Sequence, residues 1–276
     1  MLEKLIRDTG FNCLIKGRYG YILFNKNDTY VGRAFEKYGE FSENEVALFR
    51  QICTRGDIVI DIGANIGAHT LAFSEFVGST GRVYAYEPQR IVFQTLCANM
   101  AINSIQNVEC CQMAVADKKG MIRIPDIRYD LPANHGGFQV KEAQTGIKTP
   151  IISIDDVFET PRLKLIKIDV EGMETQVISG ARQTIGRFKP FLYVENDQVE
   201  KSRGLIETIQ ALDYRLFWHL PPLFNPDNFA KDPENIFQGI VSFNMLCFHR
   251  SLDLNLDGFQ EIIDSAEHPL KNADTI

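Results

Sequence analysis

The sequence predicts an α/β fold with a mostly parallel, seven-stranded sheet and helices on both of its faces. Apolar runs of strand length alternate with longer amphipathic segments along most of the chain, which is typical of strands joined by crossover helices. In the clearest example, the run at 58–62 ends in a glycine-rich turn at 63–67 and leads into an amphipathic segment. Such a strand–turn–helix unit is typical of nucleotide sites at the edge of an open sheet.

The core elements follow from this alternation. Strands are expected at 57–62, 82–87, 108–114, 163–169, 191–195, 214–219 and 240–248. Helices are expected at 66–77, 89–103, 172–186 and 200–212. The last two strands are expected to pair as a hairpin. Together these elements would form one domain over residues 51–250.

Three further segments flank or interrupt this domain. Residues 1–50 would form an extension with a small β-hairpin around 19–28 and a helix that begins at Ser42, in a capping box with Glu45. Residues 117–155 would form a β-rich insertion with short runs at 121–124, 137–141 and 150–154. Residues 251–276 would be a polar tail with one short helix around 259–263. The insertion and the proline-rich loop at 221–229 are expected to wall a substrate pocket.

Composition narrows the class of protein. The 276 residues carry a net charge of −7 and no Lys/Arg-rich block, which argues against wide contact with a nucleic-acid backbone. Apolar runs are too short to span a membrane, and charges interrupt the first seven residues, so no secretion signal is expected. Six cysteines without a C-x-x-C pattern indicate reduced thiols, and hence a cytoplasmic protein.

The turn after the first strand indicates which nucleotide binds. Asp61, Gly63 and Gly67 form the pattern D-x-G-x-x-x-G, in which Asn65 replaces the middle glycine of a dinucleotide fingerprint. The Asp61 carboxylate would repel a pyrophosphate but suits S-adenosylmethionine, which carries an ammonium, a sulfonium and no phosphate. Glu87 ends the next strand, where a carboxylate accepts hydrogen bonds from the two hydroxyls of a ribose. We therefore expect S-adenosylmethionine as the cofactor.

Three stretches give the chain a family resemblance. They are the residues 61–67, Tyr86-Glu87-Pro88, and the segment 167–174, which reads KIDVEGME. Together with the strand at 190–195, they resemble the FkbM family of class I S-adenosylmethionine-dependent methyltransferases. The resemblance implies a Rossmann-like class I methyltransferase fold and methyl transfer, commonly to a hydroxyl of a small molecule such as a sugar, a polyketide or another secondary metabolite.

The resemblance also implies where the cofactor lies. Asp61, Gly63, Ala64, Asn65 and Gly67 would face its methionine part, and Glu87 would hold the ribose. By topology, the adenine would meet the end of the third strand, near Met113, Ala114 and Val115.

The acceptor would then lie over the fourth to sixth strands. Their carboxyl ends carry Asp169 and Glu171, then Glu195, and finally His219. A hydroxyl must lose a proton as it attacks the methyl group, so one of these four residues is expected to act as general base; His219 has an unperturbed pKa near working pH. His69, in the first turn of the first helix, is expected to be neutral and to cover the cofactor.

Several alternatives stay open at this point. Asp169, Glu195 and Asn196 offer oxygen ligands that suit Mg²⁺ or Ca²⁺, although no metal site is assigned. An amine acceptor, such as an amino sugar, would need only acids around it. A nicotinamide-dependent oxidoreductase is disfavoured by Asp61, and a catalytically silent adenosyl-binding module by the many polar residues at the strand ends.

Overall fold

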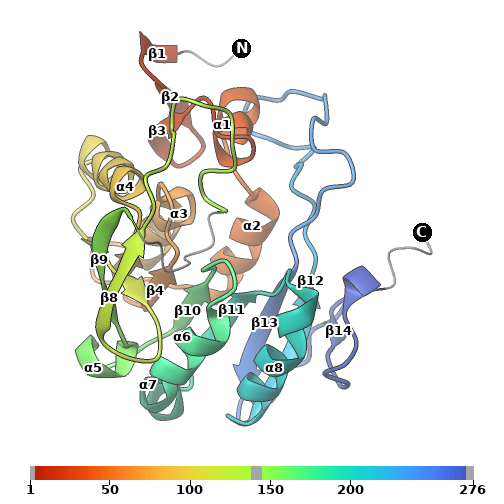
Figure 1. Cartoon of the computed structure of the whole chain (residues 1–276). Helices are drawn as coiled ribbons and strands as arrows, with labels where there is room; N and C mark the ends of the chain where they lie inside the picture. Colours follow the sequence, from red (N-terminus) through yellow and green to blue (C-terminus); the bar gives the residue numbers. More distant parts are fainter. Residues whose placement is uncertain (1–3, 138–144, 272–276) are drawn as a thin grey trace.

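A computed structural model describes residues 4–137 and 145–271, and a twisted central sheet organises them (Figure 1). Its order is β14-β12-β13-β11-β10-β4-β5-β6. Five strands run parallel to one another, namely β4 (Ile58–Ile62), β5 (Arg82–Tyr86), β6 (Val108–Cys111), β10 (Leu165–Ile168) and β11 (Phe191–Glu195). The predicted α/β fold with a mostly parallel sheet is confirmed.

The sheet ends in antiparallel strands, as expected for its last hairpin. β13 (Asn244–His249) runs antiparallel between β11 and β12 (Tyr214–His219). The short strand β14 (Gln260–Glu261) adds an eighth member at the edge of β12. The prediction of a short helix around 259–263 is therefore wrong: the free backbone edge of β12 takes up this segment, and Arg215 binds Glu261 through two hydrogen bonds of 2.8 Å.

Helices cover both faces of the sheet, because alternate residues of each strand point to opposite sides. On one face, side chains such as Val59 and Leu165 pack against α2 (Glu43–Ile52) and α3 (Ala68–Val77), next to α4 (Arg90–Ile102). On the other, Ile60 and Ile166 pack against α6 (Glu174–Gly180), α7 (Arg182–Phe188) and α8 (Val199–Gln210). The strands are accordingly buried on both faces.

The single helix predicted at 172–186 is in fact two. The chain leaves helical geometry at Ala181, whose φ and ψ are −115° and 10°. The Asp155 carboxylate accepts hydrogen bonds of 2.8 Å from the backbone N–H groups of Gln183 and Thr184. These bonds satisfy amides that would otherwise lack a partner at the start of α7. The break thus depends on a residue of the short helix α5 (Ile154–Val157), far away in sequence.

The N-terminal extension is larger than the predicted hairpin. It is a three-stranded sheet of β1 (Lys4–Thr9), β2 (Asn12–Gly17) and β3 (Gly20–Asn25), followed by α1 (Val31–Tyr38). The hairpin turn lies between Gly17 and Gly20, not after residue 24. Ser42 is the N-cap residue of α2, as predicted, but the bonds of a capping box are not formed: Ser42 has a φ of 50° and donates its hydroxyl to the Glu45 carboxylate at 2.6 Å instead of accepting from the backbone.

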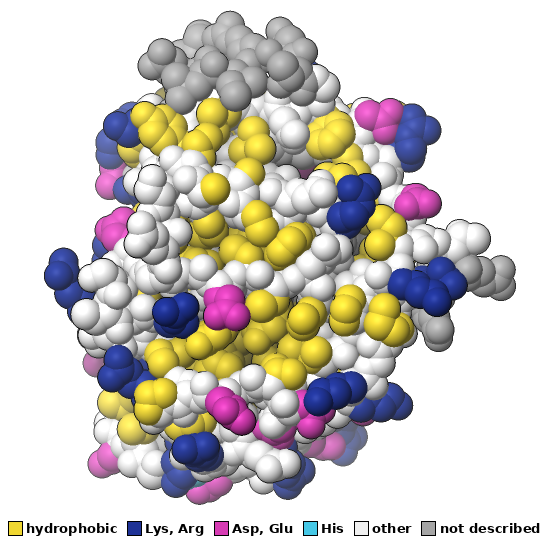
Figure 2. All heavy atoms as spheres, turned by 90° about the vertical axis from the view of Figure 1, so that its left-hand side faces the viewer, with side chains coloured by type: hydrophobic (Ala, Val, Ile, Leu, Met, Phe, Trp, Pro, Cys, Tyr) yellow, Lys and Arg dark blue, Asp and Glu magenta, His cyan; other side chains and the backbone are white. Residues whose placement is uncertain are grey.

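The insertion forms a separate small sheet of β7 (Ala114–Val115), β9 (Ile147–Ile152) and β8 (Gly120–Ile124). Residues 114–115, expected to continue the third core strand, pair with β9 instead. Most of the run predicted at 137–141 lies outside the described residues. Figure 2 looks onto the face that carries α4, β8 and β9, where apolar side chains gather between scattered charges. None of the described helices is long and apolar enough to cross a membrane.

Candidate active site

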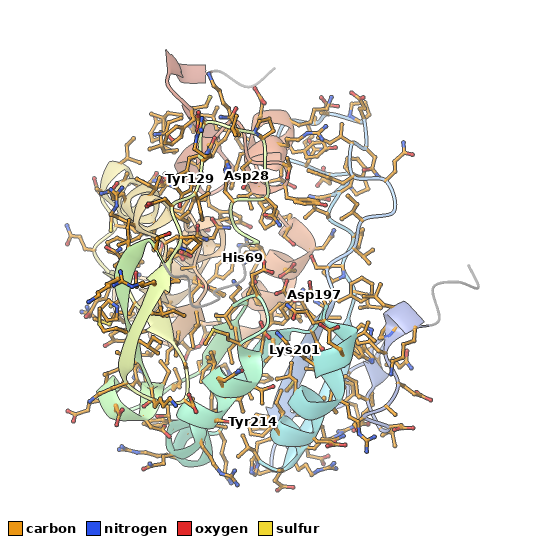
Figure 3. The ribbon with its side chains drawn as sticks, viewed as in Figure 1. Asp28, His69, Tyr129, Asp197, Lys201 and Tyr214 are labelled. Carbon is orange, nitrogen blue, oxygen red and sulfur yellow. The ribbon has the colours of Figure 1, made fainter. Side chains whose placement is uncertain are left out.

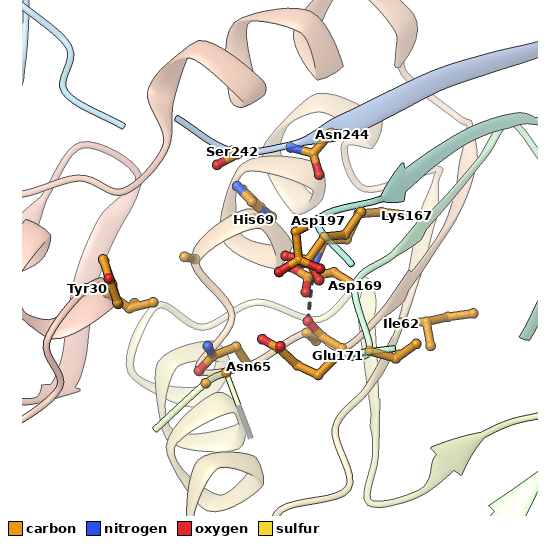
Figure 4. A pocket seen from close by; sticks show the side chains of 18 of the residues that line it. Tyr30, Ile62, Asn65, His69, Lys167, Asp169, Glu171, Asp197, Ser242 and Asn244 are labelled. Carbon is orange, nitrogen blue, oxygen red and sulfur yellow. Dashed lines mark hydrogen bonds and ion pairs between the residues drawn. The ribbon is translucent and has the colours of Figure 1, made fainter. Parts of the chain in front are cut away.

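A cavity of about 440 Å³ opens at the carboxyl ends of β4, β5, β10 and β11. This volume lies within the range of sites that hold a small molecule or cofactor. Its walls come from the loops that follow these strands, from the N-terminal extension and from the segment between β12 and β13 (Figures 3 and 4). Of the residues that the sequence singled out, this cavity brings together Asn65, His69, Glu87, Asp169, Glu171 and Glu195.

The loop after β4 is fixed by close backbone contact with the loop after β10. Gly63 has a φ of 76°, and a Cβ at this position would lie 1.7 Å from the carbonyl oxygen of Asp169. Asn65 also adopts a positive φ, of 51°. The N–H groups of Gly63 and Ala64 donate to the carbonyl oxygen of Tyr86 at 3.0 Å. Only glycine allows the two loops to meet in this way at position 63.

Glu87 supports the same loop from the end of β5. Its two carboxylate oxygens accept hydrogen bonds from the backbone N–H groups of Asn65, at 3.0 Å, and of Gln89, at 2.8 Å. Burial raises the pKa of Glu87 to about 7 despite these bonds. Beside Glu87, the cavity is lined by Gly63, Ala64, Asn65, Met113, Ala114 and Val115.

This end of the cavity fits an adenosyl group. It combines one carboxylate acceptor with the apolar side chains of Met113, Ala114 and Val115, whereas a ribose needs acceptors for its hydroxyls and an adenine needs apolar contact. Two predicted cofactor residues do not line it. Asp61 is fully buried, accepts a hydrogen bond from Thr70 and lies 3.6 Å from the ammonium of Lys167, and Gly67 forms the turn into α3.

Three carboxylates gather in the cavity where the loop after β10 meets the end of β11. Asp169, Glu171 and Glu195 each offer an oxygen atom, and these atoms lie within 4.8 Å of one another. Lys167 neutralises part of this charge: its ammonium lies 3.1 Å from Asp169 and donates to the carbonyl oxygen of Gly63 at 3.1 Å. Asp197 adds a further acid to the wall.

The environment of Glu171 and Glu195 favours their protonated forms. Burial, then repulsion from Asp169 and Asp197, raises the pKa of Glu171 to about 8. The same causes, burial first, raise the pKa of Glu195 well above its usual value, and one of its oxygens is buried without a hydrogen-bond partner among the described residues. Perturbed carboxyl groups of this kind mark candidate acid–base residues.

Two residues that the sequence placed on the acceptor side, His219 and Asn196, are not among the described residues that line the cavity. The Nδ1 atom of His219 lies 2.8 Å from the Tyr193 hydroxyl, and its ring packs against Phe259. Asn196 donates its side-chain amide to Ser202, at 3.0 Å, and also contacts Met245. His219 therefore does not face Asp169 and Glu171, because its side chain points to the side of the sheet that Tyr193 occupies.

Sequence reasoning missed several residues that line the cavity. Glu45 comes from the N-terminal extension, and Ser242 and Asn244 come from the segment that enters β13. No local pattern marks these three. Lys167, by contrast, could have been recognised from the sequence. It is the one cation inside the apolar run of β10, and it is buried there.

The chain is similar in sequence to known methyltransferases. The family model of the "Methyltransferase FkbM domain" matches residues 61–216. A relative, 31-O-demethyl-FK506 methyltransferase FkbM of Streptomyces tacrolimicus, is 31% identical over 157 residues, which cover 45% of this chain and 59% of the relative. The chain thus spans about three-fifths of that relative's length.

Solved structures give weaker likenesses. Methyltransferase FkbM from Methylobacillus flagellatus is 19% identical, with a TM-score of 0.45 over 75% of this chain and 51% of that one. An S-adenosylmethionine-dependent O-methyltransferase from Thermotoga maritima is 12% identical, with a TM-score of 0.48 over 88% and 94%. Because the family model spans more than half of the sequence, the chain belongs to the FkbM methyltransferase family.

Proposed function

We propose that this cavity binds S-adenosylmethionine and that the protein methylates a hydroxyl group of a small molecule. One observation carries the proposal: a carboxylate-supported glycine loop and a cluster of proton-accepting carboxyls share one cavity, at the edge of the sheet where ligands of open α/β folds bind. When bound, S-adenosylmethionine supplies an electrophilic methyl group on a sulfonium. The family membership of the chain supports this choice of cofactor.

In this proposal, the residues at the Glu87 end hold the cofactor. Glu87 would accept the ribose hydroxyls, the backbone from Gly63 to Asn65 would face the methionine part, and Ala114 and Val115 would cover the adenine. Asp61 would not touch the cofactor but would hold Lys167 in place next to the glycine loop. Its complete burial and its distance of 3.6 Å from the Lys167 ammonium favour this indirect role. Gly67 lets the chain turn into α3, with a φ of 89°.

Glu171 is our candidate for the general base. It lines the cavity, and a pKa of about 8 brings it close to the working pH, where a carboxylate both ionises and accepts a proton effectively. Asp169, paired with Lys167, would orient the acceptor. Glu195 would hold a proton and so reduce the negative charge beside Glu171. Contact with Tyr193 favours a structural role for His219.

An amine acceptor is the second candidate, and the charge of the cavity favours it. Six carboxyl groups but only Lys167 as a cationic side chain line the cavity within the described part of the chain. An ammonium would be attracted to this wall and could give its proton to Glu171 before attack.

The test is transfer of a labelled methyl group from S-adenosylmethionine to acceptors offered as alcohol and amine pairs of the same skeleton. We expect transfer to alcohols and its loss, by about 10²-fold or more, in Glu171→Gln, with Glu200→Gln on the exposed surface of α8 as control. Transfer to amines alone would establish the second candidate. Binding of S-adenosylhomocysteine without transfer to any acceptor would instead favour a silent module.

A further inference from the structure

The cavity has a second half that lies away from Glu87 and is built differently. It is walled by α1 and the segment after it, and by the segment between β12 and β13. Apolar side chains dominate it, and they belong to Tyr30, Val31, Phe41, Leu223, Ile240, Val241, Phe243 and, from the tail, Leu270. All of these residues lie outside positions 61–216. We call this set the apolar wall.

His69 brings an unsatisfied polar group to this half. The side chain lines the cavity from the first turn of α3 and is 7% exposed. Its Nε2 is buried and has no hydrogen-bond partner among the described residues. The ring packs edge-on against Phe49, with 5.4 Å between ring centres, and lies 6.0 Å from Phe41. In Figure 4, His69 lies beside Ser242 and Asn244, with the carboxylates between it and Asn65.

A buried nitrogen without a partner costs free energy, about 1–3 kcal/mol in typical cases. Burial, helped by the charge of Lys167, lowers the pKa of His69 to about 3, so the imidazole stays neutral. A neutral imidazole carries one donor and one acceptor nitrogen. A hydroxyl group can serve either nitrogen, because it both donates and accepts, whereas a phosphate oxygen only accepts.

The charge of the cavity also selects among acceptors. Glu45 and Asp169 are the acids nearest this half, and Glu45 is itself buried against Ser42 and Ser242. The cation Lys167 is already held by Asp61, Asp169 and the Gly63 carbonyl oxygen. An anionic group would therefore find no free cation among the described lining residues to receive it.

We propose that His69 is a specificity-determining residue that binds a hydroxyl group of the acceptor, and that the acceptor is an uncharged, hydroxylated molecule with an apolar body. This inference rests on the proposed function, because it assumes that the cavity binds a methyl acceptor. It concerns binding alone and does not depend on which hydroxyl receives the methyl group. Phosphorylated and carboxylated metabolites are excluded by it.

The first experiment measures binding to the full chain saturated with S-adenosylhomocysteine. The probes are 1-naphthol and 4-methylumbelliferone, each paired with its phosphate monoester, together with 1-methylnaphthalene, which has the shape of 1-naphthol without its hydroxyl. At pH 6.5, we expect fluorescence titrations to show that each alcohol binds at least tenfold more tightly than its phosphate. Equal or tighter binding of the phosphates, or binding of none of the probes, would overturn the proposal.

The second experiment replaces the imidazole by a ring without nitrogens. In His69→Phe, we expect the affinity for 1-naphthol to fall about fivefold or more, the affinity for 1-methylnaphthalene to stay within twofold, and the melting temperature not to fall. His69→Gln, which can still form hydrogen bonds, should retain part of the preference for the alcohol. His249→Phe is the control, since His249 bonds to Ser251 at the far end of β13.

These readouts separate the two proposals. A His69→Phe protein that unfolds, or that loses S-adenosylhomocysteine along with 1-naphthol, would assign His69 a structural or cofactor-binding role and refute the inference. Intact preference for 1-naphthol in both variants would refute it as well. Absence of methyl transfer, with the binding pattern as expected, would refute the proposed function alone.

Discussion

The ligand-free protein should lose stability as the pH rises from 7.0 to 8.5. Glu171 and Glu195 have pKa values raised by burial and by neighbouring carboxylates, to about 8 in the case of Glu171. In the unfolded chain, both groups are already ionised at pH 7. The native state therefore binds more protons than the unfolded state, and the free energy of unfolding falls as the pH rises through the native pKa values.

The size of the loss follows from the number of protons retained. Each proton that only the native state holds lowers the free energy of unfolding by about 1.4 kcal/mol per pH unit. Glu171, which titrates within this window, would contribute about 1 kcal/mol, and Glu195, whose pKa is also raised, would add to the loss. The loss of about 1 kcal/mol from Glu171 corresponds to a fall in melting temperature of about 2–4 °C for a chain of this size.

The assay is chemical and thermal unfolding at several pH values in the absence of ligand. Glu195→Gln keeps the shape of the side chain but cannot ionise, so it should reduce the slope, whereas Glu200→Gln on the surface should leave it unchanged. Above pH 7, histidines are largely neutral in both states and do not obscure the result. A wild-type stability that is flat or rises between pH 7.0 and 8.5 would show that the carboxyl cluster is ionised in the native protein.

Three further predictions concern the cofactor end of the cavity and its charge. Glu87→Gln should weaken binding of S-adenosylhomocysteine by about tenfold or more, measured by calorimetry, because it removes a charged acceptor and leaves one backbone N–H without a partner. Gly63→Ala should abolish this binding, since its Cβ would collide with Asp169, whereas Gly120→Ala, which meets no atom within 4 Å, should retain it. A chelator such as EDTA should leave methyl transfer unchanged, because Lys167 already supplies the positive charge beside Asp169; restoration of lost activity by Mg²⁺ would contradict this reasoning.

The order of the core elements could be predicted because each has a local cause. Strands buried on both faces produce continuous apolar runs, as in residues 58–62, and the helices between them bury one side only. The positions of Glu87 and Asp169 follow from the same argument, since parallel strands bring their carboxyl ends to one edge. These are the residues that the cavity indeed brings together.

Other elements could not be predicted, because their cause lies far away in sequence. Residues 260–261 form a strand only because β12 offers a free edge and Arg215 a partner for Glu261. His219 ends a core strand, as Glu195 does, but Tyr193 of β11, on the far side of β13, holds its imidazole away from the cavity. Position at a strand end identifies which residues can approach a site, and the packing of neighbours decides which of them do.

The boundary of the family match separates the residues proposed to hold the cofactor from the apolar wall, although His69 lies within the match. The residues proposed to hold the cofactor and the base lie within positions 61–216, whereas the apolar wall and Glu45 lie outside it. Tyr30 and Leu223, almost two hundred positions apart in the chain, line the same half. Contacts of that range leave no periodic signal in a sequence, so the acceptor half can be recognised only once the chain is folded. The acceptor of this protein should accordingly be sought by the shape and charge of the apolar wall, with His69 as the group against which candidate molecules are tested.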